Sequence, residues 1–390
     1  MNWRLLLSIS LILVVSSTVF TSKYYLFQSI TTDNRFAFST TLNQASRNIS
    51  NLEVKIVSPL DGIYHAANPD FDGSEDVVTA ERIIEYEELV GKEIAWAYFS
   101  NNWIDDIEFP EESVRLIDSL DITPFIRMMP RSTMNQGEAD PVYTLQGIID
   151  GDFDDRLREW AQDAKNTDIP LMVEFGTEVN GDWFPWSGIF NGGDETVEYG
   201  DINTADGPER FRDAYRHIID LFKDENVNNI TWVFHVVPSY DVGDEIPSDA
   251  PWNRIENYYP GDDYIDWIGT SVYGSIAPGN EWSTFSDIMD IAYEELESLS
   301  TAKPFAILEF GIIEDPEMGN KSEWLGDALN LILEGAYPQI KAISYWNEKY
   351  IDDDGNLIDL TIDSSSEATE IYKRFISSPF FISTTKYGSN

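Results

Sequence analysis

An α/β fold is predicted for this chain, a (β/α)8 TIM barrel formed by a single domain, and three observations predict it. Short β-rich runs alternate with amphipathic helical stretches along most of the sequence. The length of 390 residues exceeds what one small domain needs but suits a single large barrel. No Gly-rich phosphate-binding loop follows any of the β-rich runs, which disfavours the main competitor, a doubly wound sheet.

The predicted strands and helices alternate in chain order. The strands are short apolar runs at 61–65, 94–99, 123–128, 171–178, 231–236, 267–273, 305–310 and 342–346. The helices repeat apolar residues at the helical period and lie at 80–90, 113–120, 208–222, 284–299 and 322–333. A last helix at 368–376 follows a group of N-cap candidates between Asp363 and Ser366.

The N-terminus has the pattern of a targeting segment. Arg4 precedes an apolar run that extends from Leu5 to Phe20. Residues 1–22 are therefore predicted to be either a secretory signal peptide or an uncleaved N-terminal anchor, since the run is almost long enough to span a bilayer. We expect an extracellular or cell-surface protein that meets a membrane only through such an anchor.

The remainder of the chain is assigned by composition. Residues 23–51 include a stretch rich in Thr, Ser, Asn and Gln and are expected to form a flexible lead-in. The barrel domain is assigned to 52–380, because no second linker and no repeat interrupt it, and a tail to 381–390.

The composition excludes several classes of function. With 70 acidic and 25 basic residues, the net charge of −45 argues against nucleic acid as a partner. The absence of Cys excludes disulfides, Cys-bound zinc and thiol catalysis, and the presence of only 3 His disfavours a His-rich metal site. The distributed acid fits either a salty habitat or an ordinary acidic secreted enzyme. The Asp-rich segment 352–359 is interpreted as a polar turn, because the sixth position of a calcium loop beginning at Asp352 would be Leu357 rather than Gly.

Two glutamates follow predicted buried strands. Glu309 ends the run Pro-Phe-Ala-Ile-Leu, and Glu178 lies between a buried run and a loop rich in Gly and Trp. A salt bridge of Glu309 to Lys303 or Arg127, and a solvated Glu178, are the structural alternatives. Together, two carboxylates at the carboxyl ends of barrel strands suit glycoside hydrolysis, because the field of one raises the pKa of the other.

The motifs around these glutamates resemble those of glycoside hydrolase family 26. The segment Glu178-Val-Asn-Gly-Asp-Trp-Phe-Pro-Trp186 is similar to the acid/base motif of that family. Lys303-Pro-Phe-Ala-Ile-Leu-Glu-Phe-Gly311 resembles its nucleophile strand, and Asp266-Trp-Ile-Gly-Thr-Ser-Val-Tyr273 resembles its sixth strand. Tyr345-Trp346 matches the aromatic at the end of strand eight. The resemblance extends over most of residues 52–380 and implies a clan A barrel and a retaining reaction.

The resemblance also implies roles for individual residues. Glu178 would be the general acid/base, Glu309 the nucleophile and Tyr273 the group that orients the nucleophile. Trp183 and Trp346 would form sugar-stacking surfaces. The polar groups that would contact the substrate are Thr177, Asn180, Ser271 and Arg127. A retaining mechanism predicts that the two carboxylates lie about 5–5.5 Å apart.

Three positions depart from the family pattern. Thr177 stands where the family usually has His, Glu174 where Arg is common, and Ser271 where mannan-active members commonly have Asp. Because Glu174 and Glu178 share strand parity, both are expected to point into the barrel. Glu174 then needs a cation, and Arg127 is predicted to place its charged atoms within about 6 Å of that carboxylate.

We therefore expect a monomeric, secreted, retaining endo-β-glycanase of the mannan endo-1,4-β-mannosidase type that needs no cofactor and no metal. β-1,4-Mannan is the first expected substrate, by its frequency in the family. A β-1,3-1,4-glucanase or β-1,3-xylanase is the alternative within the same fold, because of Thr177 and Ser271. An alternative of another class is a catalytically silent barrel that binds polysaccharide, which the presence of both glutamates disfavours.

Overall fold

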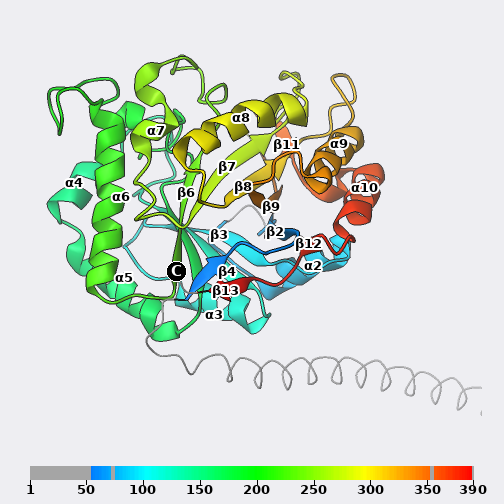
Figure 1. Cartoon of the computed structure of the whole chain (residues 1–390), viewed down its shortest axis with the longest axis horizontal. Helices are drawn as coiled ribbons and strands as arrows, with labels where there is room; N and C mark the ends of the chain where they lie inside the picture. The colour runs from blue at the N-terminus through cyan, green and yellow to red at the C-terminus, as the bar shows by residue number, and fades with distance from the viewer. Residues whose placement is uncertain (1–53, 72–74, 352–354, 389–390) are drawn as a thin grey trace, which may run out of the picture. The chain divides into compact units, whose positions relative to one another are not determined.

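The computed structural model describes residues 54–71, 75–351 and 355–388, and parallel strands close into a barrel at its centre (Figure 1). The strands follow one another in chain order, and the first pairs with the last. They are β2 (Ile63–Pro69), β3 (Trp96–Asn102), β4 (Thr123–Met129), β5 (Leu171–Phe175), β6 (Ile230–Val236), β7 (Trp267–Tyr273), β8 (Phe305–Gly311) and β9 (Ile340–Asn347). The predicted (β/α)8 fold is confirmed. The expected leader at 1–22 and lead-in at 23–51 lie outside the described residues.

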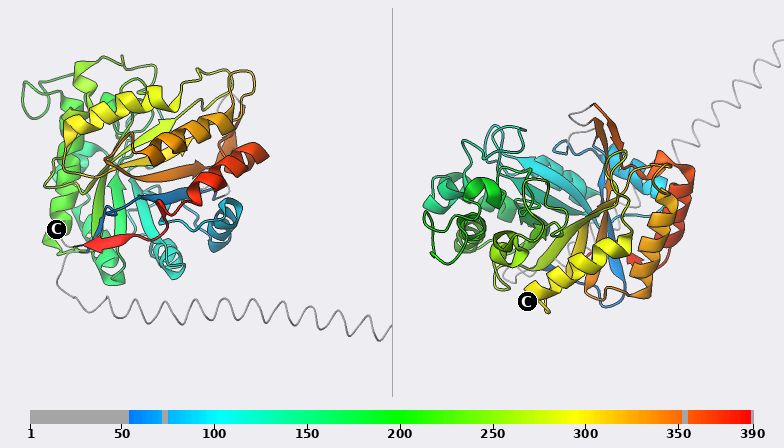
Figure 2. Two further views of the ribbon diagram at one scale, coloured as in Figure 1. Left: turned by 45° about the vertical axis from the view of Figure 1, so that its right-hand side comes forward. Right: turned by 90° about the horizontal axis from the view of Figure 1, so that it is seen from above.

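Helices lie around the outside of the strands, as the three views agree (Figures 1 and 2). The α-helices are α2 (Ala80–Val90), α3 (Glu111–Ser119), α4 (Leu145–Asp150), α5 (Asp154–Thr167), α6 (Asp206–Asp224), α7 (Ile255–Tyr258), α8 (Phe285–Leu299), α9 (Lys321–Glu334) and α10 (Ser366–Ile376). Short 3-10 turns are η1 (Gly188–Asn191), η2 (Pro251–Asn253) and η3 (Ile362–Ser364). Within the described ranges, every helix is too short or too polar to span a lipid bilayer.

The sequence analysis did not identify α4 and α5, which connect β4 to β5. The buried face of α5 contains Leu157, Trp160, Ala161 and Ala164 at helical spacing. The remaining face is dominated by charged side chains, and among the five buried residues, which also include Thr167, two are alanines. The apolar signal is therefore weak, although Asp154 and Asp155 in the first turn suit a helix N-terminus.

The chain segment after residue 380 belongs to the fold rather than forming a free tail through Gly388. Strand β12 (Phe381–Ile382) pairs in parallel with β2, and β13 (Lys386–Gly388) pairs antiparallel with β1 (Lys55–Val57). These strands are only two and three residues long. A run this short has no periodicity by which sequence analysis could find it. Strands β10 (Lys349–Ile351) and β11 (Leu357–Asp359) form an antiparallel pair next to the Asp-rich turn.

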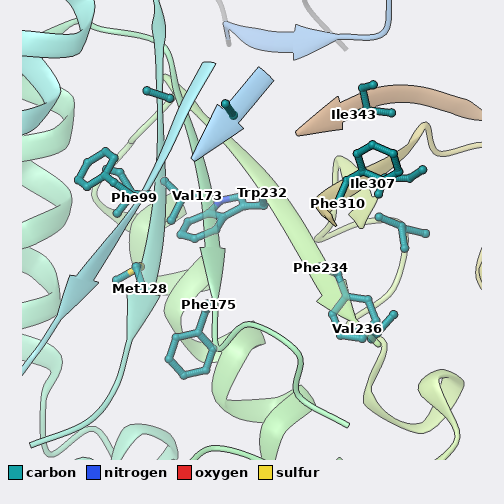
Figure 3. Close-up of a cluster of buried hydrophobic side chains, with 14 of the residues drawn as sticks. Phe99, Met128, Val173, Phe175, Trp232, Phe234, Val236, Ile307, Phe310 and Ile343 are labelled. Atoms are coloured by element: carbon teal, nitrogen blue, oxygen red, sulfur yellow. The ribbon is translucent and has the colours of Figure 1, made fainter. Parts of the chain in front are cut away.

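Alternation along the strands divides the apolar side chains into two layers. One set packs between the strands and the helices and includes Phe99, Met128, Val173, Phe175, Phe234, Ile307, Phe310 and Ile343 (Figure 3). The other set fills the barrel interior and includes Tyr64, Trp96, Phe125, Met172, Val233, Trp267, Ala306 and Ala342. Side chains of successive strand residues point to opposite faces, so the same strands supply both layers.

The inward-facing positions become polar towards the carboxyl ends of the strands. On six of the strands, the residue two or four positions after the interior apolar residue is polar and buried. These residues are Asn68, Ser100, Arg127, Glu174, His235 and Ser271. We call these six residues the polar layer. They lie at the end of the barrel where the chemistry of this fold is located.

His65 is a buried titratable group away from this layer. Its Nδ1 lies 3.3 Å from the Glu93 carbonyl oxygen, and its Nε2 lies 3.0 Å from the Tyr372 hydroxyl. Burial lowers the pKa of His65 from about 6.5 to about 4. Between pH 6.5 and pH 4, His65 is therefore protonated in the unfolded chain but neutral in the native state.

We predict that acidification from pH 7 to pH 4.5 destabilises the wild type by about 2–3 kcal/mol more than it destabilises His65→Gln. The reason is that the unfolded chain binds a proton at residue 65 in this window and the native state does not. Urea unfolding at both pH values measures the difference. Equal slopes for the wild type and His65→Gln would contradict the prediction.

Candidate active site

A register shift in the barrel turns Glu309 inward. Thr270 pairs with Ile307, but Ser271 pairs with Glu309, so one residue of β8 is skipped. Without this bulge, the inward parity of Ala306 and Leu308 would leave Glu309 facing the helices. Bulges commonly redirect side chains in this way next to functional sites.

Glu178 reaches the same end of the barrel through a turn, which corrects the strand predicted at 171–178. Strand β5 ends at Phe175, because Gly176 and Glu178 adopt left-handed backbone angles with φ of 64° and 51°. A Cβ at position 176 would lie 2.8 Å from the Phe211 ring, so glycine is required there. Left-handed backbone at a non-glycine residue is a strained conformation that tends to occur at functional sites. The parity argument for Glu178 was therefore wrong, although this residue does approach Glu309.

The two glutamates lie close together. Glu178, His235 and Glu309 each place one nitrogen or carboxylate oxygen so that these atoms lie within 4.8 Å of one another. One oxygen of Glu178 thus approaches one oxygen of Glu309 to within 4.8 Å, a closeness that suits the spacing of about 5–5.5 Å in retaining glycosidases better than the spacing of about 6.5–9.5 Å in inverting enzymes.

The hydrogen bonds of the two carboxylates differ. Both oxygens of Glu178 are hydrogen-bonded, since Ser271 Oγ donates to Oε1 at 2.5 Å and Trp183 Nε1 donates to Oε2 at 2.9 Å. The hydroxyl of Tyr273 donates to Oε2 of Glu309 at 2.8 Å. Oε1 of Glu309 is buried and has no hydrogen-bond donor among the described residues. One oxygen of Glu309 is therefore left for another partner.

Burial and the neighbouring Glu178 carboxylate raise the pKa of Glu309 above its ordinary value. Arg127, His235 and the Tyr273 hydroxyl act in the opposite direction.

Arg127 is the cation of the site. Its guanidinium lies 3.6 Å from Glu174, 3.5 Å from Glu309 and 2.7 Å from Glu75, and only 3% of its side chain is exposed. The predicted pairing of Arg127 with Glu174 is confirmed. The guanidinium also lies 5.1 Å from the centre of the Trp346 ring, a cation–π contact that covers one face of that ring.

The other residues predicted to contact substrate make contacts mainly with other residues of the protein. Thr177 Oγ1 lies 2.7 Å from His235 Nδ1, and both residues are buried. The Asn180 side chain exchanges two hydrogen bonds with the backbone of Val237. Trp183 is half-buried and its indole nitrogen contacts Glu178, whereas Trp346 is 5% exposed.

Sequence analysis missed three titratable residues near the pair. Glu75 contacts Arg127, and His235 lies between Glu174 and Ser271. Asp241 follows β6 and lies near enough to Glu178 for the charge of that carboxylate to affect it. Burial and the Glu178 carboxylate raise the pKa of Asp241 to about 7. A histidine at an inward position of the apolar run 230–236 was a signal in the sequence, but the loop residues Glu75 and Asp241 gave none.

The same cluster does not have the form of a metal centre. The ring nitrogens of His235 are both engaged, Nε2 with Ser271 at 3.0 Å and Nδ1 with Thr177 at 2.7 Å. A metal ion would have to break one of these bonds, because a histidine ligand offers a free nitrogen lone pair.

Comparison with known proteins supports a family assignment. The model of glycosyl hydrolase family 26 matches residues 140–322, a range that contains Glu178, Ser271 and Glu309. This match supports assignment of the chain to glycoside hydrolase family 26. Sequence relatives include Endoglucanase H of Acetivibrio thermocellus, 29% identical over 60% of this chain and 23% of that protein. A mannan endo-1,4-beta-mannosidase of Bacillus subtilis is 24% identical over 50% of this chain and 44% of that protein. The chain thus spans less than half the length of these curated relatives.

Solved structures agree with the family-26 fold. GH26C from Muricauda sp. MAR_2010_75 aligns with a TM-score of 0.57 over 88% of this chain and 90% of that chain, at 14% identity. The catalytic domain of an endo-beta-1,4-mannanase from Bacillus sp. JAMB-750 gives a TM-score of 0.56 over 82% of this chain and 87% of that chain, at 20% identity. At these identities the likeness supports the barrel architecture alone.

We predict that Tyr273→Phe raises the pKa of Glu309 further, by about one unit, because the hydroxyl that stabilises the carboxylate is removed. Carboxyl carbon NMR of protein labelled at glutamate measures this titration. Tyr199→Phe is the matched control, because its hydroxyl bonds the distant Asp213. An unchanged Glu309 titration in Tyr273→Phe would contradict the assigned contact.

Proposed function

We propose that this protein is a retaining endo-β-glycanase. The observation that carries the proposal is the buried Oε1 of Glu309, which lacks a donor among the described residues and lies beside Glu178. This oxygen is available to attack carbon, while Tyr273 donates to the other oxygen, Oε2, and the Arg127 guanidinium lies 3.5 Å from Oε1 itself.

The reaction would follow double displacement. Glu309 attacks the anomeric carbon, and Glu178 gives its proton to the leaving glycosidic oxygen, so that a glycosyl–enzyme ester forms. Glu178, now a carboxylate, takes a proton from water, which attacks the same carbon and releases Glu309. The spacing of at most 4.8 Å between the two carboxylates supports this order over direct displacement by water.

β-1,4-Mannan is the first proposed substrate, because mannan endo-1,4-beta-mannosidases are among the sequence relatives. A β-1,3-1,4-glucanase is the second candidate, and a β-1,3-xylanase the third. Thr177 and Ser271 favour these alternatives, because both hydroxyls are buried and bonded to His235 rather than open to a sugar. The sequence relatives named Endoglucanase H and Beta-1,3-xylanase also support these two alternatives.

We further propose that the enzyme is exported or anchored at the cell surface and acts as a monomer without a cofactor. The apolar run that begins at Leu5 supports export. The net charge of −45 supports a salty habitat, where ions screen the repulsion between surface carboxylates.

We predict that Glu309→Ala and Glu178→Ala each reduce kcat on the polysaccharide by several orders of magnitude, because each removes one of the two groups of the mechanism. With a 2,4-dinitrophenyl glycoside, whose leaving group needs no acid, azide should restore turnover and yield a glycosyl azide of inverted configuration for Glu309→Ala and of retained configuration for Glu178→Ala. NMR of the products distinguishes the two. Near-normal activity of Glu309→Ala would refute the assignment.

The substrate preference gives a second prediction. We expect mannan to be favoured over mixed-linkage glucan by less than about a hundredfold in kcat/KM, roughly 2.7 kcal/mol. The physical reason is that aromatic stacking tolerates epimers, whereas buried polar contacts reject them, and the polar candidates Thr177 and Ser271 are already bonded within the protein. Reducing-sugar assays on mannan, mixed-linkage glucan and β-1,3-xylan across salt concentrations test this. A preference above a hundredfold contradicts it, and binding without any hydrolysis would favour the silent barrel.

A further inference from the structure

His235 connects the acid/base glutamate to a buried carboxylate behind it. Nε2 of His235 lies 3.0 Å from Ser271 Oγ, which donates to Glu178 Oε1 at 2.5 Å. On the other side of the ring, Nδ1 lies 3.2 Å from Glu174 Oε2. The imidazole side chain is fully buried, so its hydrogen bonds are made within the protein.

The three departures from the family pattern converge on this imidazole. Glu174 lies on β5, Thr177 just after β5 and Ser271 on β7, and each has a polar side-chain atom within 3.2 Å of a His235 ring nitrogen. Each exchange alone would leave a buried polar group in need of a partner. Together with His235 they form one connected network, which we call the Glu174–His235–Ser271 chain.

The charges around His235 fix the direction of its hydrogen bonds. Burial by itself would lower the pKa of His235, but the Glu174 carboxylate raises it above its ordinary value, and Glu309 and Glu178 act in the same direction. The Ser271 hydroxyl gives its one proton to Glu178, so its oxygen can only accept from His235 Nε2, while Nδ1 on the other side of the ring faces the Glu174 carboxylate.

Other elements contribute charged or titratable groups to the same region. The Tyr98 hydroxyl of β3 donates to Glu174 at 2.5 Å and lies 3.2 Å from His235 Nδ1. Arg127 of β4 contacts Glu174 and Glu309, and Asp241, in the loop after β6, lies near Glu178. The chain from Glu174 to Ser271 is the part of this set that reaches Glu178 through hydrogen bonds.

We propose that His235, held by Glu174 and linked to Glu178 through the Ser271 hydroxyl, is a positioning residue that sets the pH range in which Glu178 works as acid and as base. This inference rests on the proposed glycanase function. The directed donor and the imidazolium charge stabilise the Glu178 carboxylate and offset its repulsion from Glu309.

The test is the pH dependence of kcat/KM for the wild type, Ser271→Ala and His235→Asn on the polysaccharide that the wild type hydrolyses. The basic limb reports loss of the proton from the acid/base group in the free enzyme. We expect this limb to move to higher pH by about one unit in Ser271→Ala and by at least as much in His235→Asn, since each loses stabilisation of the carboxylate. His217→Asn, remote from the site and bonded to Asp154, should keep the wild-type profile.

A second readout separates positioning from loss of structure. With a 2,4-dinitrophenyl glycoside the leaving group needs no acid, so the first step should be within about threefold of wild type in Ser271→Ala. With a poor aryl leaving group the variant should show the displaced basic limb. Asp241→Asn serves as a background variant, and the shift caused by Ser271→Ala should persist in it.

The outcomes are distinct. If the wild type hydrolyses no β-glycan, the proposed function fails. If it does, the role of His235 is tested separately. A basic limb that stays within about 0.3 of a pH unit of wild type in Ser271→Ala and in His235→Asn, which is the error of such a fit, would refute that role while the glycanase function stands. An equal rate loss on both aryl glycosides without a displaced limb would also overturn the role, because a merely structural contribution predicts that result.

Discussion

The buried guanidinium of Arg127 is the interaction on which the carboxyl end of the barrel depends. Glu174 and Glu309 lie inside the barrel, and an unpaired carboxylate there would cost several kcal/mol. Arg127 lies within 3.6 Å of both and also contacts Glu75 from the loop after β2. The Arg127 guanidinium therefore helps several carboxylates to share a small volume, and their mutual fields contribute to the acid–base properties of the site.

Two departures from regular backbone geometry bring the reacting carboxylates together. The bulge between β7 and β8 turns Glu309 inward, and the left-handed turn after β5 brings Glu178 to the same place from outside the strand. The strained conformation of Glu178 is stabilised by its surroundings, because Ser271 and Trp183 hold both carboxylate oxygens. A regular barrel with these residues would not form the pair.

The order of strands could be read from the sequence because parallel barrel strands are continuous apolar runs bounded by helices. The segments predicted at 123–128 and 267–273 coincide with β4 and β7 to within one residue. Helix α5 was not predicted, because its apolar face is narrow and partly made of alanine. Strands β12 and β13 were not predicted, because strands of two and three residues show no periodic pattern. Glu178 and Glu309 were recognised from motifs, which depend on local residue order.

The sequence by itself determined the barrel, the two glutamates and the need for a cation near Glu174, since these follow from periodicity, motif and the cost of buried charge. The tertiary structure alone decided the partners. Ser271 is hydrogen-bonded to Glu178, which lies 93 residues away in the sequence, and His235 contacts Glu174, which lies 61 residues away. No local sequence pattern encodes such contacts. Closure of the barrel brings inward side chains from different strands within hydrogen-bond distance, and the register shift in β8 decides which of them meet.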